Sequence, residues 1–297
     1  METEEFRCHN CPTCLGKACI DELPGMGGVN KNENFILNCS AWDKLYAQED
    51  ASKIPELSSE EVLSLLRYAP VTGAQENIGW ETEEDFYYDF FVALYNAGVK
   101  LSIGDGCPDA KLLYGIKAIQ TIQKEKDKNL KAAVFLKPYS DENLVNRMAW
   151  SAPIASHIGI DIDAYNIVTM RNKAKLEKKS AYQIQELMKH LFVPFVVKGV
   201  FTREDIEMVK DAKPDVIYIS NHGGRVETRK GSTASLLKEA GPILKKCCGQ
   251  LWVDGGIRKK RDIELASFYG ADQVLVARPF IKNWCYNGYV GIDEFIK

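Results

Sequence analysis

One glycine-rich turn, Ser220-Asn221-His222-Gly223-Gly224-Arg225, brings a histidine and an arginine together. The glycines leave both side chains free of steric cover. Histidine can accept a proton near neutral pH, and an arginine three residues on can hold a carboxylate by two-point contact. A lone histidine is weak evidence, but His222 is one of only 4 in the chain and has an arginine beside it. The turn predicts a proton-accepting site for a carboxylate.

A second turn, Asp254-Gly255-Gly256-Ile257-Arg258, and the later Ala277-Arg278-Pro279 have the chemistry of a phosphate site. Glycines let the backbone approach closely and present N–H groups, while arginines can fork onto phosphate oxygens. The alternative is a tight turn with two solvated arginines. Because both turns carry an arginine and follow neighbouring strands, we favour phosphate binding.

Lys198 ends an otherwise apolar run, Phe195-Val196-Val197-Lys198. A lysine at the end of a buried strand directs its ammonium group into the mouth of a pocket, where it can compensate a delocalised anion. The alternative is a side chain that reaches past the apolar surface to water.

The N-terminus carries four cysteines, Cys8, Cys11, Cys14 and Cys19, spaced as C-x₂-C-x₂-C-x₄-C. This spacing suits thiolate ligation of an iron–sulfur cluster or of zinc. The last gap differs from the bacterial ferredoxin pattern, so free thiols remain the alternative. The start of the chain is acidic where a signal peptide would be basic, which predicts a cytoplasmic protein with reduced cysteines.

Short apolar runs bounded by Gly or Pro recur along the rest of the chain, as expected of strands buried on both faces. The eight runs are Tyr68–Thr72, Val99–Ile103, Ala132–Leu136, His157–Asp161, Pro194–Lys198, Val216–Ser220, Leu251–Asp254 and Gln273–Ala277. Helical patterns lie between them, for example the apolar face of Phe86, Phe90 and Leu94. Eight alternating units predict a closed (β/α)₈ barrel, with an open doubly wound sheet as the alternative.

In such a barrel the loops after the strands carry the function, and the polar residues described above all fall there. Capping patterns at Ser58 with Glu61, and at Thr202 with Asp205, mark two helix starts. We therefore divide the chain into a cysteine-rich N-terminal extension, residues 1–55, and a barrel, residues 56–297.

Composition is that of an ordinary folded protein, with 45% hydrophobic and 27% charged residues and a net charge of −3. We find no basic stripe for nucleic acid and no apolar segment long enough to span a bilayer. The sequence therefore excludes nucleic acid and a membrane as partners.

The motifs Ser220–Arg225, Asp254–Arg258 and Ala277–Pro279 resemble the FMN-dependent 2-hydroxy-acid oxidases and dehydrogenases, the family of glycolate oxidase and lactate oxidase. The resemblance is strongest from about residue 192 to 280. It implies an FMN-binding barrel that oxidises a small carboxylate substrate, a 2-hydroxy acid, and a homo-oligomeric assembly.

The resemblance also implies roles for single residues. His222 would be the catalytic base and Asp163 the carboxylate that orients it, both as catalytic residues. Arg225 would bind the substrate carboxylate, and Lys137 and Tyr139 are the further candidates for contact with substrate. The candidate FMN-binding residues are Thr72, Ser102, Lys198, Asp254, Gly255, Gly256, Arg258, Ala277 and Arg278.

The sequence departs from the family pattern around the substrate. Phe135 and Lys137 stand where the family carries Gln and Tyr, and Asp161 replaces a Thr near the flavin. A second substrate-binding arginine has no clear equivalent. Two alternatives therefore stay open: an FMN-dependent isomerase similar to type 2 isopentenyl diphosphate isomerase, and a flavoprotein with a diverged substrate site.

Overall fold

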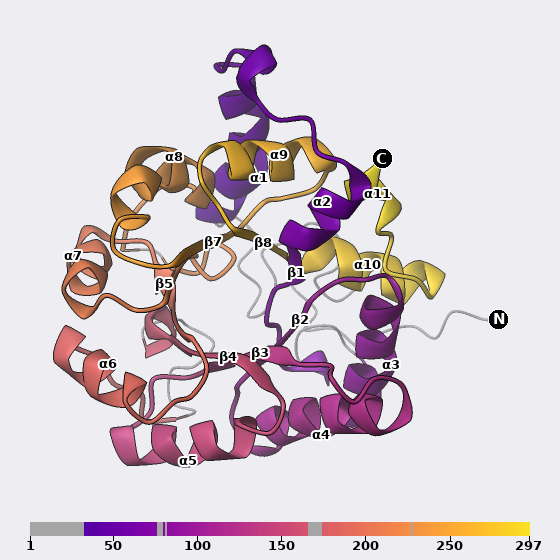
Figure 1. Cartoon of the computed structure of the whole chain (residues 1–297), viewed down its shortest axis with the longest axis vertical. Helices are drawn as coiled ribbons and strands as arrows, with labels where there is room; N and C mark the ends of the chain where they lie inside the picture. Colours follow the sequence, from indigo (N-terminus) through magenta and orange to yellow (C-terminus); the bar gives the residue numbers. More distant parts are fainter. Residues whose placement is uncertain (1–32, 76–79, 81, 166–173, 227) are drawn as a thin grey trace.

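The computed structural model describes residues 33–75, 80, 82–165, 174–226 and 228–297. Eight parallel strands form its centre and helices surround them (Figure 1). The strands are β1 (Leu66–Tyr68), β2 (Leu101–Gly104), β3 (Ala132–Leu136), β4 (Ala155–Asp161), β5 (Phe195–Val200), β6 (Val216–Ile219), β7 (Gln250–Asp254) and β8 (Gln273–Val276).

The sheet closes on itself. Its strand order is β1-β8-β7-β6-β5-β4-β3-β2, and every neighbouring pair is parallel. The two ends of this order meet at an isolated parallel bridge between Arg67 and Lys100, where the N–H of Tyr68 donates to the Lys100 carbonyl at 2.8 Å. The prediction of a (β/α)₈ barrel is confirmed.

Helices connect the strands and cover the outside of the barrel. They are α1 (Glu33–Tyr46), α2 (Ser59–Leu65), α3 (Glu83–Asn96), α4 (Ala110–Glu125), α5 (Asp141–Ser151), α6 (Ala181–Met188), α7 (Arg203–Ala212), α8 (Thr233–Leu244), α9 (Lys260–Phe268), α10 (Arg278–Asn287) and α11 (Asp293–Ile296), with short 3₁₀ turns η1 (Ala51–Lys53) and η3 (Ile162–Tyr165). None of the helices in the described ranges is long and apolar enough to cross a bilayer.

Local sequence explains where several elements begin. Ser58 and Glu61 form the expected capping box at the start of α2, and Thr202 and Asp205 form one at α7. A capping side chain of this kind stabilises a helix by about 1 kcal/mol. The first strand departs from its prediction: it ends at Tyr68, not Thr72, two residues before Pro70, which has no N–H to donate to a strand ladder.

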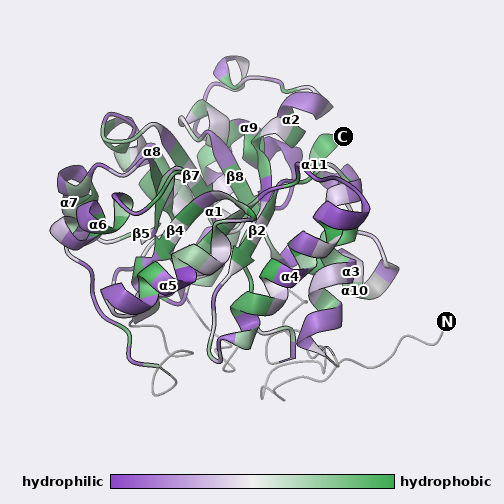
Figure 2. Ribbon diagram, turned by 60° about the horizontal axis from the view of Figure 1, so that its bottom comes forward, coloured by the Kyte–Doolittle hydropathy of each residue, from purple (hydrophilic) through white to green (hydrophobic). Residues whose placement is uncertain are grey.

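The interior of the barrel is packed. Phe135, Tyr218 and Trp252 point inward from β3, β6 and β7, with ring centroids 5.5 Å to 6.3 Å apart. A larger apolar layer lies between the strands and the helices, which are hydrophobic toward the strands and more polar outside (Figure 2). The barrel is therefore a solid support, and a site is to be sought at its rim.

Candidate active site

The turn after β6 presents His222 in a constrained backbone. His222 has a φ of 57°, in the left-handed region, and is followed by Gly223 and Gly224 at φ 65° and 90°. Asn221 fixes the turn, because its side-chain oxygen accepts the N–H of Gly224 at 2.9 Å and its carbonyl accepts the N–H of Val226 at 3.2 Å. Holding a non-glycine residue in this region costs about 1–2 kcal/mol, which the surrounding bonds must offset.

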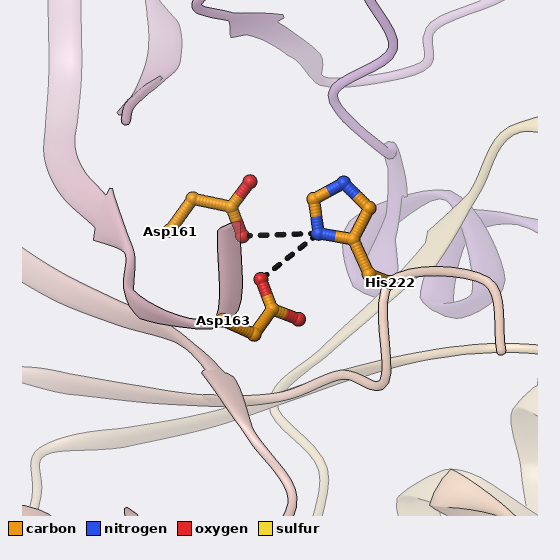
Figure 3. A group of neighbouring side chains, drawn as sticks. All are labelled: Asp161, Asp163 and His222. Atoms are coloured by element: carbon orange, nitrogen blue, oxygen red, sulfur yellow. Dashed lines mark hydrogen bonds and ion pairs between the residues drawn. The ribbon is translucent and has the colours of Figure 1, made fainter. Parts of the chain in front are cut away.

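His222 faces two buried carboxylates from the end of β4 (Figure 3). Its Nδ1 lies 2.9 Å from Oδ1 of Asp163 and 3.5 Å from Oδ1 of Asp161. With Nδ1–H donating to Asp163, the other ring nitrogen, Nε2, is the one that can accept a proton. The structure thus brings together the histidine and the aspartate that the family resemblance pairs.

The two aspartates lie in different elements. Asp161 is the last residue of β4, and Asp163 lies in the 3₁₀ turn η3 that follows. Space for Asp163 comes from Gly199, where the pairing of β5 with β6 shifts register. A Cβ atom on Gly199, whose φ is 95°, would lie 2.7 Å from Cγ of Asp163.

Asp161 accepts hydrogen bonds from two lysines. Its Oδ2 lies 2.7 Å from Nζ of Lys137, and its Oδ1 lies 2.6 Å from Nζ of Lys198. All three side chains are buried. Burial alone would raise the pKa of Asp161, but the two ammonium groups outweigh it and hold the pKa well below its usual range.

The neighbouring groups respond differently to the same surroundings. Burial raises the pKa of Asp163, and the negative charge of Asp161 adds to this effect. Burial would lower the pKa of Lys198, but the carboxylates of Asp161 and Asp163 outweigh it and raise that pKa. The site is therefore a compact set of compensating charges around one imidazole, as is typical of functional sites.

The same three side chains could in principle ligate a metal. One ligand atom from each of Asp161, Asp163 and His222 lies within 4.8 Å of the others. Two ammonium groups already contact Asp161, so a divalent cation would sit beside two positive charges. We therefore interpret the cluster as a proton-handling site.

Arg225 lies on the same turn as His222. Its Nη1 donates to the His222 carbonyl oxygen at 3.2 Å, so the guanidinium lies against the backbone of the same turn. Tyr139 lies apart from these residues: its hydroxyl donates to the Gly106 carbonyl at 3.3 Å, and the Arg147 guanidinium covers its ring at 4.2 Å. The structure therefore groups Arg225 and Lys137 with His222, whereas the Tyr139 side chain packs on the loop after β2.

The predicted phosphate residues meet where β7 and β8 end. Gly255 and Gly256 have φ values of 99° and 79°, and neither N–H donates to a backbone carbonyl within the described residues. Arg278 is the first residue of α10, a ten-residue helix, with Ala277 as its N-cap. N–H groups without a backbone partner in this part of the chain, next to a helix N-terminus, can form an anion-binding environment.

Two further predicted residues also fit FMN. Ser102 on β2 is fully buried, and its Oγ has no hydrogen-bond partner within the described part of the chain. Buried hydroxyl groups are normally bonded, so this atom is suited to a ligand. Lys198 has three N–H donors, and its one described hydrogen-bond partner is Asp161. The residues present thus fit a flavin ring and its phosphate.

Two other predicted residues support neighbouring segments. Asp254 accepts the Tyr218 hydroxyl at 2.7 Å and the Ser220 hydroxyl at 2.9 Å, which links β7 to the His222 turn. Thr72 donates to the Asp105 carbonyl at 3.2 Å and so connects the segments after β1 and β2.

Sequence analysis missed the role of α1, which falls in residues 1–55. Asn38 and Asn221 exchange side-chain hydrogen bonds of 2.8 Å and 3.0 Å, and Trp42 Nε1 donates to the Gly255 carbonyl at 2.8 Å. A Cβ atom on Gly256 would lie 2.0 Å from the Asn38 carbonyl oxygen. The signal was present as Asn34, Asn38 and Trp42, which recur every fourth residue and are all buried. The four N-terminal cysteines proposed as metal ligands lie outside the described residues.

Comparison with known proteins places the chain in a family. The sequence model of the FMN-dependent dehydrogenases matches residues 118–297, a stretch that includes His222, Asp163 and Lys198. The chain therefore belongs to the FMN-dependent dehydrogenase family.

Individual relatives match shorter stretches. A peroxisomal (S)-2-hydroxyacid oxidase of Arabidopsis thaliana is 36% identical over 104 residues, which are 35% of this chain and 28% of that protein. L-lactate dehydrogenase (cytochrome) of Saccharomyces cerevisiae is 35% identical over 119 residues, 38% of this chain and 20% of that protein. The match thus spans less than a third of either curated relative.

The fold is shared over a longer range. The structure of a mandelate oxidase mutant with the C4a-OH-FMN adduct superposes with a TM-score of 0.65, at 19% identity, over 94% of this chain and 87% of that one. This similarity supports the barrel architecture.

Proposed function

We propose that the protein uses FMN to oxidise a small 2-hydroxy acid to the 2-oxo acid. The observation that carries the proposal is the hydrogen bond of 2.9 Å between His222 Nδ1 and the buried Asp163, which leaves Nε2 to accept the substrate hydroxyl proton. Related proteins named as 2-hydroxyacid oxidase and L-lactate dehydrogenase support the reaction class.

The proposed roles follow from the position of each side chain. FMN, when bound, supplies the acceptor for the hydrogen on the substrate's C2 carbon. Its phosphate would lie at Gly255, Gly256, Arg258 and Arg278, and its ring beside Ser102 and Lys198. Arg225 and Lys137 would hold the substrate carboxylate by charge-assisted hydrogen bonds.

Proton transfer needs an imidazole that can bear a positive charge. As Nε2 takes the hydroxyl proton, the ring becomes an imidazolium, and Asp163 stabilises it through the Nδ1 hydrogen bond. The second carboxylate, that of Asp161 at 3.5 Å, adds to this stabilisation. No observation on the site favours the isomerase, or a flavoprotein without substrate turnover.

Four further expectations extend the proposal. We propose a cytoplasmic, homo-oligomeric enzyme with residues 1–55 as an extension of the barrel.

Cys8, Cys11, Cys14 and Cys19 would bind an iron–sulfur cluster or zinc, and an absorption spectrum with metal analysis of anaerobically purified protein tests this. A cluster would give the flavin an electron acceptor.

The test of the proposed function is anaerobic bleaching of bound flavin. Protein loaded with FMN is mixed with a panel of 2-hydroxy acids, including glycolate and lactate, and flavin absorbance is followed. We expect bleaching by at least one acid, none by the matched acid without a 2-hydroxyl group, and loss of bleaching in His222→Ala. Stoichiometric FMN that no acid bleaches would overturn the proposal.

A further inference from the structure

In the proposed reaction Asp161 acts only through its charge near His222, although it also contacts two buried lysines. It is 4% exposed and lies between Lys137 at 2.7 Å and Lys198 at 2.6 Å. Both lysines are themselves nearly inaccessible to water. Interactions between charges are strong in such surroundings, because water screens them little.

The charge of Lys198 matters for a flavin in particular. A flavin ring gains negative charge when it is reduced, and a nearby cation stabilises this form. A carboxylate 2.6 Å from the same ammonium group opposes that stabilisation. Asp161 remains a carboxylate at neutral pH because the two ammonium groups hold its pKa well below the usual range, despite burial.

Lys137 also affects the charge balance around Asp161. It donates to Oδ2 of Asp161, whereas Lys198 donates to Oδ1. Lys137 therefore compensates part of the carboxylate's charge, and its removal would leave Lys198 to compensate Asp161 alone. The net electrostatic effect on the flavin ring therefore depends on both Asp161 and Lys137.

We propose that Asp161 is a positioning and tuning residue that lowers the reduction potential of bound FMN, and that Lys137 limits this effect. The inference rests on the proposed function, since it requires the flavin ring beside Lys198. A lower potential makes the flavin a weaker oxidant of the acid and a better donor to the next electron acceptor. Substitution of Asp161 would then shift the balance toward oxidation of the acid.

The test measures the midpoint potential and the sulfite affinity of FMN-loaded variants. In Asp161→Asn we expect a higher potential and about tenfold tighter sulfite binding; a tenfold change corresponds to about 30 mV for a two-electron couple. In Lys137→Met we expect shifts in the opposite direction. The double variant should return close to the wild-type values, because both opposing charges are removed.

The controls separate charge from structure. Asp272→Asn makes the same chemical change just before β8, at the opposite end of the barrel, where the carboxylate pairs with Lys245. This variant should leave the potential unchanged. A purely structural role of Asp161 would not give shifts of opposite sign in the two single variants.

Binding of FMN, measured first by fluorescence quenching, distinguishes failure of the proposed function from failure of the inference about Asp161. Absence of FMN binding in the wild type overturns the proposed function. If FMN binds and acids bleach it, an unchanged or lowered potential in Asp161→Asn overturns the inference alone. If Asp161→Asn does not fold, Lys137→Met decides, since only a lower potential agrees with the inference.

Discussion

In the proposed reaction one ring nitrogen of His222 accepts the substrate proton, because the other is held by Asp163. The bond of 2.9 Å fixes both the tautomer and the direction of the ring. Asp163 in turn occupies space that exists because residue 199 is glycine. The chemistry at this scale therefore depends on a chain of three residues from β5, η3 and the turn after β6.

Asp163→Asn tests this dependence. The amide can still bond the ring, but it cannot stabilise the imidazolium that forms during proton transfer. We expect flavin reduction to slow by a factor of roughly 10²–10⁴, by analogy with orienting aspartates in other histidine-based sites. Stopped-flow absorbance measures the rate, and Asp272→Asn is the control. Reduction at the wild-type rate, with FMN bound, would show that Asp163 does not assist His222.

Helix α1 determines how the rim turns are held. It contacts the His222 turn through Asn38 and the Gly255 turn through Trp42. Asn38 also accepts the N–H of Thr233 at 3.1 Å, at the start of α8. The buried side chain of Asn38 thus joins the His222 turn to α8, and Trp42 supports the Gly255 turn.

Asn38→Ala should weaken both stability and FMN binding. Loss of the amide leaves buried groups of Asn221 and Thr233 unsatisfied, at a cost of about 1–3 kcal/mol. We expect FMN affinity to fall about tenfold, equivalent to about 1.4 kcal/mol, because the turns are less well ordered. Fluorescence quenching and chemical denaturation measure the two effects, with Lys44→Ala, exposed on the same helix, as the control. Unchanged FMN affinity would confine Asn38 to a structural role.

Elements also show what the sequence could and could not predict. The strands were predictable because each is a short apolar run. The location of the site at the rim was predictable because parallel strands end at one edge. The Asn38–Asn221 pair joins residues 183 positions apart, so no local pattern reveals it. The pairing of Lys137 and Lys198 on Asp161 likewise depends on which strands are neighbours. The predicted end of β1 at Thr72 was wrong because the predicted strand included Pro70.

The whole barrel has two ends of different character. The site lies at the ends of the strands, whereas Arg67, Lys100 and His157 gather toward their beginnings, with Trp252 between. The His157 ring lies 4.9 Å from the Trp252 ring, and Arg67 covers the same indole at 4.8 Å. Burial lowers the pKa of His157 to about 4, and the charges of Arg67 and Lys100 add to this, against Asp215.

This shift predicts acid sensitivity of the fold. Because the folded-state pKa is below the unfolded value of 6.5, the unfolded chain binds the proton more readily, and stability falls as pH decreases from about 6.5 toward 4. Allowing for partial exposure, we expect a loss of about 1 kcal/mol between pH 7 and pH 5. His157→Gln should lose less over the same range, as measured by chemical denaturation. Equal losses in both proteins would contradict the assignment.

The most direct test of the account is a single anaerobic turnover with product analysis. FMN-loaded protein is mixed with an acid that bleaches it, and the 2-oxo acid formed is quantified against the flavin reduced. We expect one 2-oxo acid per reduced flavin in the wild type, and in His222→Asn a loss of both with FMN still bound. Flavin reduction without 2-oxo acid, or an undiminished rate in His222→Asn, would contradict it.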